Sequence, residues 1–362
     1  MEKIHAALLV LLRAGLWEHE VEDSFCFPLT EAEWKQVYLL SRQQTVTGIV
    51  FQGVQSLPEE LLPSELLLVR WMVETDAIER KNRRMNQVLT SLVKMFTTLG
   101  VCPVLQKGQG VALFYEKPLW RECGDIDFYF GSEQEFEKAR HFVRRCKLRE
   151  EKMADRSISY AWKGVEIEHH TRLLDLHNPF LRHYAGQLAH RYGYSHILLE
   201  ENGETEITVP SPVLNLLLQS LHILKHALGW GIGLRQLCDM ARTCYRLHQE
   251  VDAAEMKKIS LRLGLGRWQR LLHACLVNHL GLPVECLPYP DSASDASPLL
   301  DIIWRGGNFG QYDAGIQRPA VSLWKRKWQT ASAFRRNMGF AFRYAPKESF
   351  WMVSSLLKGQ FK

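Results

Sequence analysis

The hydrophobic periodicity of the chain changes at Gly100, and this change restricts the folds that are available. Over 65–99 the apolar residues recur at the spacing of one long helix, which the glycine ends. Beyond it, short apolar segments of the length typical of strands occur at 101–105, 126–130 and 165–167. The sequence therefore predicts a mixed α/β unit that follows a helical region.

Helical signals also flank this unit on both sides. Thr30 followed by Glu33 is a capping-box signature, which predicts the start of a helix. Downstream, Ser211 is the predicted N-cap of an apolar helix with Pro212 in its first turn, and a further helix is expected from Leu234. We therefore expect an α+β fold, in which a small mixed sheet with flanking helices lies between helical N-terminal and C-terminal regions. The predicted regions are 1–99, 100–210, 211–281 and a connector with a basic tail at 282–362.

Composition excludes several classes of protein. The 362 residues are 46% apolar and 23% charged, which is typical of a globular protein. No run of about 18 uncharged apolar residues occurs, so no transmembrane segment is expected. The apolar run at 6–12 is interrupted by Arg13 and precedes no small-residue cleavage site, which indicates an amphipathic helix. The 8 cysteines form no CxxC pair, which predicts reduced thiols, a cytoplasmic location and no zinc or disulfide scaffold.

Positive charge is concentrated near the C-terminal end. Residues 318–362 carry ten lysines and arginines against one acid, Glu348, whereas the whole chain has a net charge of +5. Aromatic residues are interleaved with these charges, so the tail is predicted either to pack as helices with solvated charges, the favoured interpretation, or to bind nucleic acid or another anionic surface. A nucleic-acid polymerase is disfavoured because the chain before residue 318 is net acidic.

Two aspartates lie on the predicted strand of the GDIDFYF segment at 124–130. Asp125 and Asp127 are two residues apart, so their carboxylates would share one face while Ile126 and Phe128 occupy the other. Paired carboxylates can hold a hard divalent cation such as Mg²⁺, which binds oxygen ligands and substrate phosphates. Exposed acids at a strand end are the alternative interpretation.

A second acidic strand is predicted in the VEIEHH segment at 165–170. Glu166 and Glu168 would share a face, and an adjacent strand would bring either of them beside the two aspartates. A third carboxylate can bind the metal and accept the proton of an attacking hydroxyl. A half-exposed antiparallel strand without such a role is the alternative.

A lysine–glycine turn precedes the aspartates. Lys107 and Gly108 follow the apolar segment at 101–105, and a strand that ends at glycine brings backbone N–H groups close to a triphosphate. Lys107 would add a mobile positive charge. An ordinary loop is the alternative interpretation of this turn taken alone.

The stretch LQKGQGVALFYEKPLWRECGDIDFYF at 105–130 resembles the lysine–glycine, tyrosine–proline and arginine–glycine–DxD block of a bacterial family described as uncharacterised nucleotidyltransferase, in the DNA polymerase β-like superfamily. The segments at 11–16, 43–54, 221–241 and 306–313 also resemble this family. The resemblance implies a magnesium-dependent nucleotidyltransferase. Such an enzyme moves a nucleoside monophosphate from a nucleoside triphosphate to a hydroxyl of a small-molecule, peptide or protein acceptor.

The resemblance also implies roles for individual residues. The implied catalytic and metal-binding residues are Asp125, Asp127 and Glu168, the last preferred to Glu166. The implied nucleotide-binding residues are Lys107, Gly108 and Arg121. The expected substrate contacts are His170, Arg172, His226, Arg235 and Asp239.

Several positions favour other interpretations or depart from the family pattern. Gln109 follows the glycine where a small residue is common, and His169 stands where an aliphatic residue is common. His222 and His226 have metal-ligand spacing, but no HExxH motif accompanies them, so zinc is disfavoured.

Alternative interpretations also remain for one residue pair and for the whole chain. Arg235 and Asp239 are also spaced as a helix-surface ion pair. For the whole chain, a kinase-like phosphotransferase and a non-catalytic nucleotide-binding or interaction protein stay open as alternatives.

Overall fold

The computed structural model contains two compact units. The helical unit comprises residues 1–75, 176–185 and 219–362, and the sheet unit comprises residues 76–175 and 186–218. The structure describes residues 2–21, 25–153, 156–200, 203–229, 231–293, 295–312 and 335–358.

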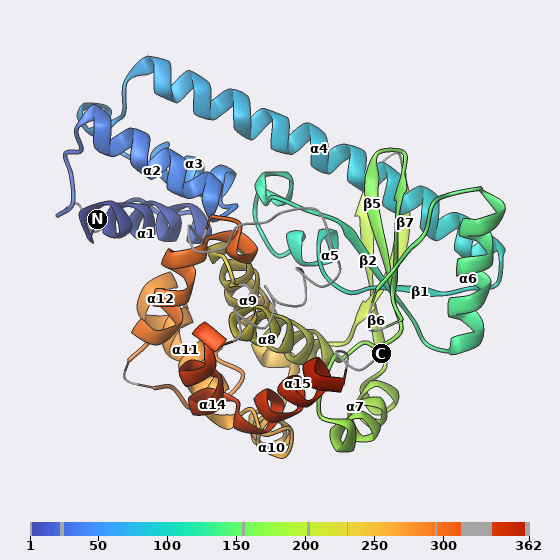
Figure 1. The fold of residues 1–362 in the computed structure, drawn as a ribbon. Helices are drawn as coiled ribbons and strands as arrows, with labels where there is room; N and C mark the ends of the chain where they lie inside the picture. The colour runs from blue at the N-terminus through green and yellow to red at the C-terminus, as the bar shows by residue number, and fades with distance from the viewer. Residues whose placement is uncertain are drawn as a thin grey trace. The chain divides into compact units, whose positions relative to one another are not determined.

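A seven-stranded mixed sheet forms the centre of the sheet unit, in the order β3-β4-β5-β2-β1-β7-β6 (Figure 1). Its strands are β1 (Pro103–Leu105), β2 (Ile126–Phe130), β3 (Glu151–Lys152), β4 (Ile158–Trp162), β5 (Val165–His170), β6 (Tyr194–Glu200) and β7 (Glu204–Pro210). The pairs β2–β5 and β1–β7 are parallel, and the other neighbours are antiparallel. This sheet, together with the helical N-terminal and C-terminal regions, confirms the predicted α+β fold.

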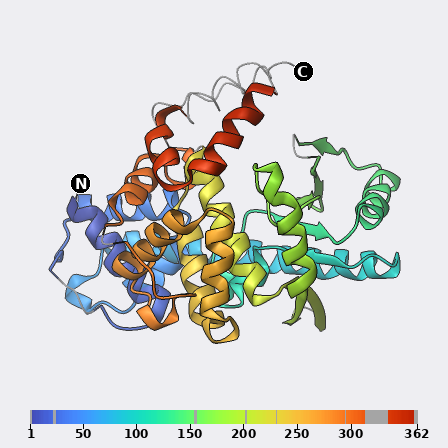
Figure 2. The ribbon, with the colours of Figure 1, turned by 90° about the horizontal axis from the view of Figure 1, so that it is seen from below.

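The remaining elements are helical. The helices are α1 (Glu2–Trp17), α2 (Glu31–Gln43), α3 (Thr47–Val54), α4 (Glu65–Thr98), α5 (Gln109–Ala112), α6 (Glu133–Arg145), α7 (Pro179–Tyr192), α8 (Pro212–Leu228), α9 (Leu234–Leu247), α10 (Ala253–Arg262), α11 (Gly266–Leu280), α12 (Ser297–Gly306), α14 (Met338–Tyr344) and α15 (Pro346–Lys358). Short 3₁₀ turns lie at Glu59–Leu61, Pro118–Trp120, His248–Glu250, Val284–Cys286 and Asn308–Gly310. Within the helical unit, α11 packs against α1, α9, α12 and α14 (Figure 2).

One face of the sheet packs against α4 and α6 and forms an aromatic core. Ile126, Phe128 and Phe130 alternate along β2 and are all buried. The Phe96 ring of α4 meets the rings of Phe128 and Phe130 edge to face, at centroid distances of 5.8 and 5.9 Å. Burying one such side chain contributes about 1.5–3 kcal/mol, so this face holds β2 firmly in place.

Local sequence signals at three helix ends agree with the structure. Thr30 and Glu33 form the predicted capping box, in which the Thr30 backbone N–H donates to Glu33 Oε2 over 2.7 Å. Helix α4 ends before Gly100, whose φ of +67° favours glycine. Helix α8 begins at Pro212 as predicted, so Ser211 stands at the N-cap position, where its carbonyl oxygen accepts from the Asn215 backbone N–H over 2.8 Å while its hydroxyl has no hydrogen-bond partner among the described residues.

The structure describes part of the predicted basic tail. Residues 318–334 and 359–362 of the predicted basic tail, and Asp313 of the 306–313 segment, lie outside the described residues. In the described part, Phe340 packs against Trp268 while Phe350 is 59% exposed. Among the described residues, no helix is both long enough and apolar enough to cross a membrane.

Candidate metal site and lysine–glycine turn

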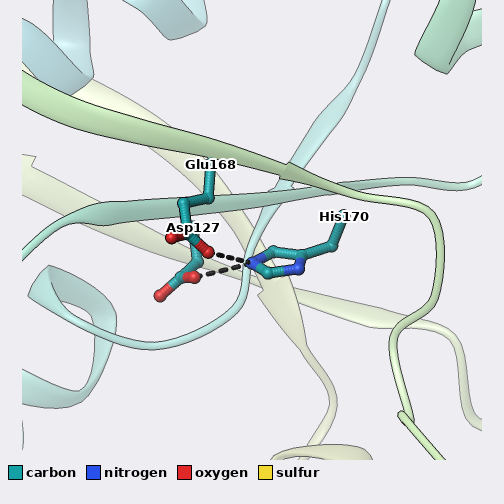
Figure 3. A group of neighbouring side chains, drawn as sticks. All are labelled: Asp127, Glu168 and His170. Atoms are coloured by element: carbon teal, nitrogen blue, oxygen red, sulfur yellow. Dashed lines mark hydrogen bonds and ion pairs between the residues drawn. The ribbon is translucent and has the colours of Figure 1, made fainter. Parts of the chain in front are cut away.

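The parallel strands β2 and β5 bring three polar side chains together on the face opposite the aromatic core (Figure 3). Asp127 lies directly across from Glu168, and His170 lies two residues further along β5. Side chains alternate along a strand, so these three share a face while Phe128 and His169 point to the other. We call Asp127, Glu168 and His170 the acidic site.

His170 joins the two carboxylates of the acidic site. Its Nε2 lies 2.7 Å from Asp127 Oδ1 and 3.3 Å from Glu168 Oε2. The second oxygen of Asp127, Oδ2, lies 3.2 Å from Lys107 Nζ. One ligand atom from each member of the acidic site lies within 4.8 Å of the other two, which is compact enough for a metal ion.

The charges of the site are strongly coupled. Burial alone would raise the pKa of Asp127, but the Lys107 charge and the His170 hydrogen bond hold it well below its ordinary value. Burial likewise opposes the charged form of His170, yet the hydrogen bonds to Asp127 and Glu168 raise its pKa to about 9. Burial also works against the Lys107 ammonium, and the carboxylates around it, led by Asp127, keep its pKa above its ordinary value. At neutral pH, Asp127 is therefore anionic while His170 and Lys107 are cationic.

The adjacent histidine has the opposite environment. His169 is fully buried, and its ring lies 4.9 Å from that of Phe130. Burial lowers the pKa of His169 to about 3, so this ring is neutral in the folded chain. Its Nε2 and the Tyr160 hydroxyl are 2.9 Å apart. His169 is thus a neutral residue packed within the aromatic core.

The lysine–glycine turn is docked onto the strand that carries Asp127. The Gln106 backbone N–H donates to the Asp127 carbonyl oxygen over 3.0 Å. Gly108 has φ of +60°, and a Cβ there would lie 3.4 Å from the Asp125 carbonyl oxygen. That distance is an ordinary van der Waals contact, so it is the positive φ that favours glycine at this position. Lys107 is therefore held beside the acidic site by the backbone itself.

Gln109 is a residue that sequence reasoning overlooked as a functional candidate. It is 3% exposed, and both atoms of its carboxamide lack a hydrogen-bond partner among the described residues. An unsatisfied buried polar group costs about 1–3 kcal/mol, so such a group in a native fold calls for a ligand or water. The sequence feature that could have indicated a role for Gln109 is its position directly after the turn glycine, Gly108.

Three other predicted residues of the sheet unit lie outside the acidic site. Asp125 stands just before β2 rather than on it, although its charge contributes to the raised pKa of Lys107. Arg121 is 4% exposed, and its Nη1 lies 3.0 Å from Cys123 Sγ. Arg172 is half-exposed, with Nη1 3.9 Å from Asp175 Oδ1.

The remaining expected substrate contacts belong to the helical unit. The rings of His222 and His226 on α8 meet edge to face, with their centroids 4.4 Å apart. Arg235 and Asp239 lie on α9 and are 8% and 7% exposed. Their interpretation as a helix-surface pair is therefore wrong, because neither side chain lies at the surface.

The donor set of the acidic site fits a divalent cation. Two carboxylates suit Mg²⁺ or Mn²⁺, whereas an imidazole nitrogen is more typical of Mn²⁺, Zn²⁺ or Fe²⁺ sites. His170, expected only as a substrate contact, is thus also placed as a potential metal ligand.

A mixed sheet with carboxylates on neighbouring strands and a lysine–glycine turn beside them is the arrangement expected of the nucleotidyltransferase class. The sequence matches the family described as "Uncharacterised nucleotidyltransferase" over residues 30–281, which is more than half of the chain. The chain belongs to this family, which confirms the resemblance. Searches of the curated proteins and of the solved structures found no match.

Proposed function

We propose that this protein transfers a nucleoside monophosphate from a nucleoside triphosphate to a hydroxyl group, with Mg²⁺ as cofactor. The observation that carries the proposal is the convergence of Asp127, Glu168 and Lys107 on one face of the β2–β5 pair. Family membership supports the same conclusion. The identity of the ion and the roles of individual residues are part of the proposal.

In this proposal, Asp127 and Glu168 hold the divalent cation, and Asp125, just before β2, completes the carboxylate set. When bound, Mg²⁺ would polarise a phosphoryl oxygen and lower the pKa of the attacking hydroxyl. Lys107 is the residue that would contact the triphosphate. It pairs with Asp127, and a triphosphate at the turn offers it a second anionic partner.

The chemistry balances without a further co-reactant. The acceptor hydroxyl oxygen attacks the α-phosphorus, the bond from that phosphorus to the bridging oxygen breaks, and pyrophosphate leaves. We propose that Glu168 accepts the hydroxyl proton, because it is less buried than Asp127 and lies on the same face. The Gln109 carboxamide, buried beside the turn, would donate to or accept from the bound nucleotide.

The deciding experiment follows label from the triphosphate into acceptors of a cell extract. Wild-type protein is incubated with each nucleoside triphosphate labelled at the α or the γ position, with Mg²⁺ or Mn²⁺. We expect α label in a new product and release of pyrophosphate. Transfer of γ label alone would replace the proposal with a phosphotransferase.

Binding is measured separately from transfer. Mn²⁺ titration followed by water-proton relaxation should detect a site that Asp127→Asn weakens by at least about tenfold, because one anionic ligand is lost. Glu166→Gln is the matched control on the same strand face. Equal Mn²⁺ affinity in Asp127→Asn and wild type would overturn the metal site.

A further inference from the structure

Within the sheet unit, one turn of α4 is hydrogen-bonded to the segment that leads into β2. The Asn82 side chain donates from Nδ2 to the carbonyl oxygens of Leu119 and Arg121, over 2.7 and 2.8 Å. The neighbouring Lys81 ammonium donates to the carbonyl oxygen of Cys123 over 2.8 Å. Two adjacent residues of one helix therefore hold three carbonyl oxygens at every second position of this segment. We call these three hydrogen bonds the α4 tether.

The tether lies in a well-packed part of the sheet unit. Asn82 is 2% exposed and Cys123 is 3% exposed. The Trp120 indole Nε1 also donates to α4, at Glu79 Oε2 over 3.0 Å. The Asn82 Oδ1 has no hydrogen-bond partner among the described residues, so the two donated bonds account for all the hydrogen bonding of this side chain. A buried amide with this pattern is explained by what its donor atoms hold.

The tethered segment ends two residues before Asp125. The pairing of β2 with its neighbours begins only at Ile126, so the sheet itself does not hold Asp125. Gly124 has no other group within 4 Å of the position of a Cβ, so packing does not hold it either. The backbone of 124–125 therefore spans the gap between tethered Cys123 and the start of β2, and two fixed ends leave it few conformations. The charge of Asp125 acts on Lys107, which shows that its carboxylate lies near the turn lysine.

We propose that Asn82 and Lys81 are positioning residues that raise the metal affinity of the site by holding Asp125 beside the lysine–glycine turn. This inference rests on the proposed function, in which Asp125 completes the carboxylate set. Residues that orient metal ligands from behind typically contribute about 10–100-fold to metal affinity. Without the tether, the 119–125 backbone would have to be ordered when the cation binds, and this cost would appear as weaker binding.

The test is a double-mutant cycle on the full-length protein, read by Mn²⁺ titration with water-proton relaxation. Asn82→Ala and Asp125→Asn should each weaken Mn²⁺ affinity about tenfold. In the Asp125→Asn background, Asn82→Ala should cost less than about a further twofold, because the carboxylate through which it acts is already lost. Equal losses from Asn82→Ala in both backgrounds, or wild-type affinity in Asp125→Asn, would overturn the inference.

Two further variants of α4 separate the tether from other effects. Asn86 lies one turn beyond Asn82 and is 8% exposed, and its side chain forms no hydrogen bond among the described residues, so Asn86→Ala should leave Mn²⁺ affinity unchanged. Lys81→Met, at an exposed position, removes one bond of the tether and serves if Asn82→Ala fails to fold by circular dichroism. Loss of a positive charge would by electrostatics alone strengthen cation binding, so a severalfold weaker affinity in Lys81→Met would report the lost tether. Unchanged or stronger binding by Lys81→Met would contradict the inference.

Hydrogen exchange of the metal-free protein measures the tether without a cation. Peptides that cover 117–125 should exchange at least about fivefold faster in Asn82→Ala than in wild type, whereas peptides of β5 should not change. Unchanged exchange over 117–125 would refute the role of the tether. Failure of the proposed function looks different: wild-type protein would then bind no Mn²⁺. Normal Mn²⁺ binding by wild type, together with equal losses in the two backgrounds, would sink this inference alone.

Discussion

The two faces of the β2–β5 strand pair have opposite chemistry although they are built from adjacent residues. On one face, Phe128 and His169 pack into an aromatic core that excludes charge. On the other, Asp127, Glu168 and His170 form the acidic site. The adjacent residues His169 and His170 consequently have pKa values of about 3 and about 9.

This difference shows how a small sheet can place charge beside a rigid core. The aromatic face fixes the position of both strands, and the register Asp127↔Glu168 then brings two carboxylates together without any further constraint. The polar face consequently carries its charges beside the lysine–glycine turn rather than in the core. Substitutions on one face should therefore have effects distinct from those on the other.

The largest effect is expected from Asp127→Asn. The substitution is nearly isosteric but removes the charge that Lys107 and His170 share, and with it a proposed metal ligand. We expect label transfer to fall about 10³-fold or more, equivalent to about 4 kcal/mol, which is typical for a group that stabilises transition-state charge. Rates are measured at saturating triphosphate. Transfer within tenfold of wild type would show that Asp127 is not a catalytic residue.

Phe128→Ala tests the aromatic face. The ring is fully buried and meets Phe96, so truncation should lower the free energy of unfolding by about 3 kcal/mol. Denaturant titration by circular dichroism measures the change. Leu198→Ala, at a 56% exposed position of the same sheet, should change stability by less than about 0.5 kcal/mol. Similar losses in both variants would contradict the assignment of the core to this face.

Much of the aromatic face could be predicted from sequence, because it depends on local alternation. The predicted strand at 126–130 coincides with β2, and Gly100 ends α4 as expected. Strands β3, β4, β6 and β7 were not individually predicted, although β4–β5 and β6–β7 pair across short turns. The parallel pairs β2–β5 and β1–β7 instead depend on contacts between distant residues. Which apolar segments become neighbours is decided by the packing of the whole sheet.

The acidic site could be predicted only in part, for the same reason. Alternation showed that Glu166 and Glu168 share a face, but not which of them meets Asp127, because the β2–β5 register is a tertiary property. The spacing of residues along the sequence likewise did not predict that Arg121 points inward and contacts Cys123. His170 between the carboxylates also follows from that register.

The pH dependence of stability should reveal the buried histidine of the aromatic face. His169 has a pKa of about 3 when folded and an ordinary value of 6.5 when unfolded. Between these values the unfolded chain binds more protons, so stability falls as the pH falls from 6.5 toward 3. From pH 7 to pH 5 this contributes a loss on the order of 2 kcal/mol. Urea midpoints in the presence of a chelator measure it.

A double variant isolates that contribution. His169→Phe/Tyr160→Phe replaces both hydrogen-bonding partners by apolar rings, which is close to neutral at pH 7. Its loss of stability from pH 7 to pH 5 should be smaller than that of wild type by the same amount. For His170 the sign is reversed: its pKa of about 9 means that its stabilisation is complete below pH 6.5 and is lost as the pH rises through 9. If the double variant lost as much stability between pH 7 and pH 5 as wild type does, His169 would not be the neutral buried group described above.

The smallest effect is expected from Glu166→Gln, and it separates two carboxylates on one strand face. Glu166 pairs with Ala161 in the register and accepts a hydrogen bond from Ser159 Oγ over 2.9 Å, whereas Glu168 lies opposite Asp127. Glutamine retains an oxygen for that bond, so label transfer should change by less than about twofold and stability by less than about 0.5 kcal/mol. Glu168→Gln should instead approach the loss in Asp127→Asn, because it removes a charge from the acidic site itself. Equal rates for the two glutamine variants would contradict the proposal that function depends on the carboxylate that lies opposite Asp127.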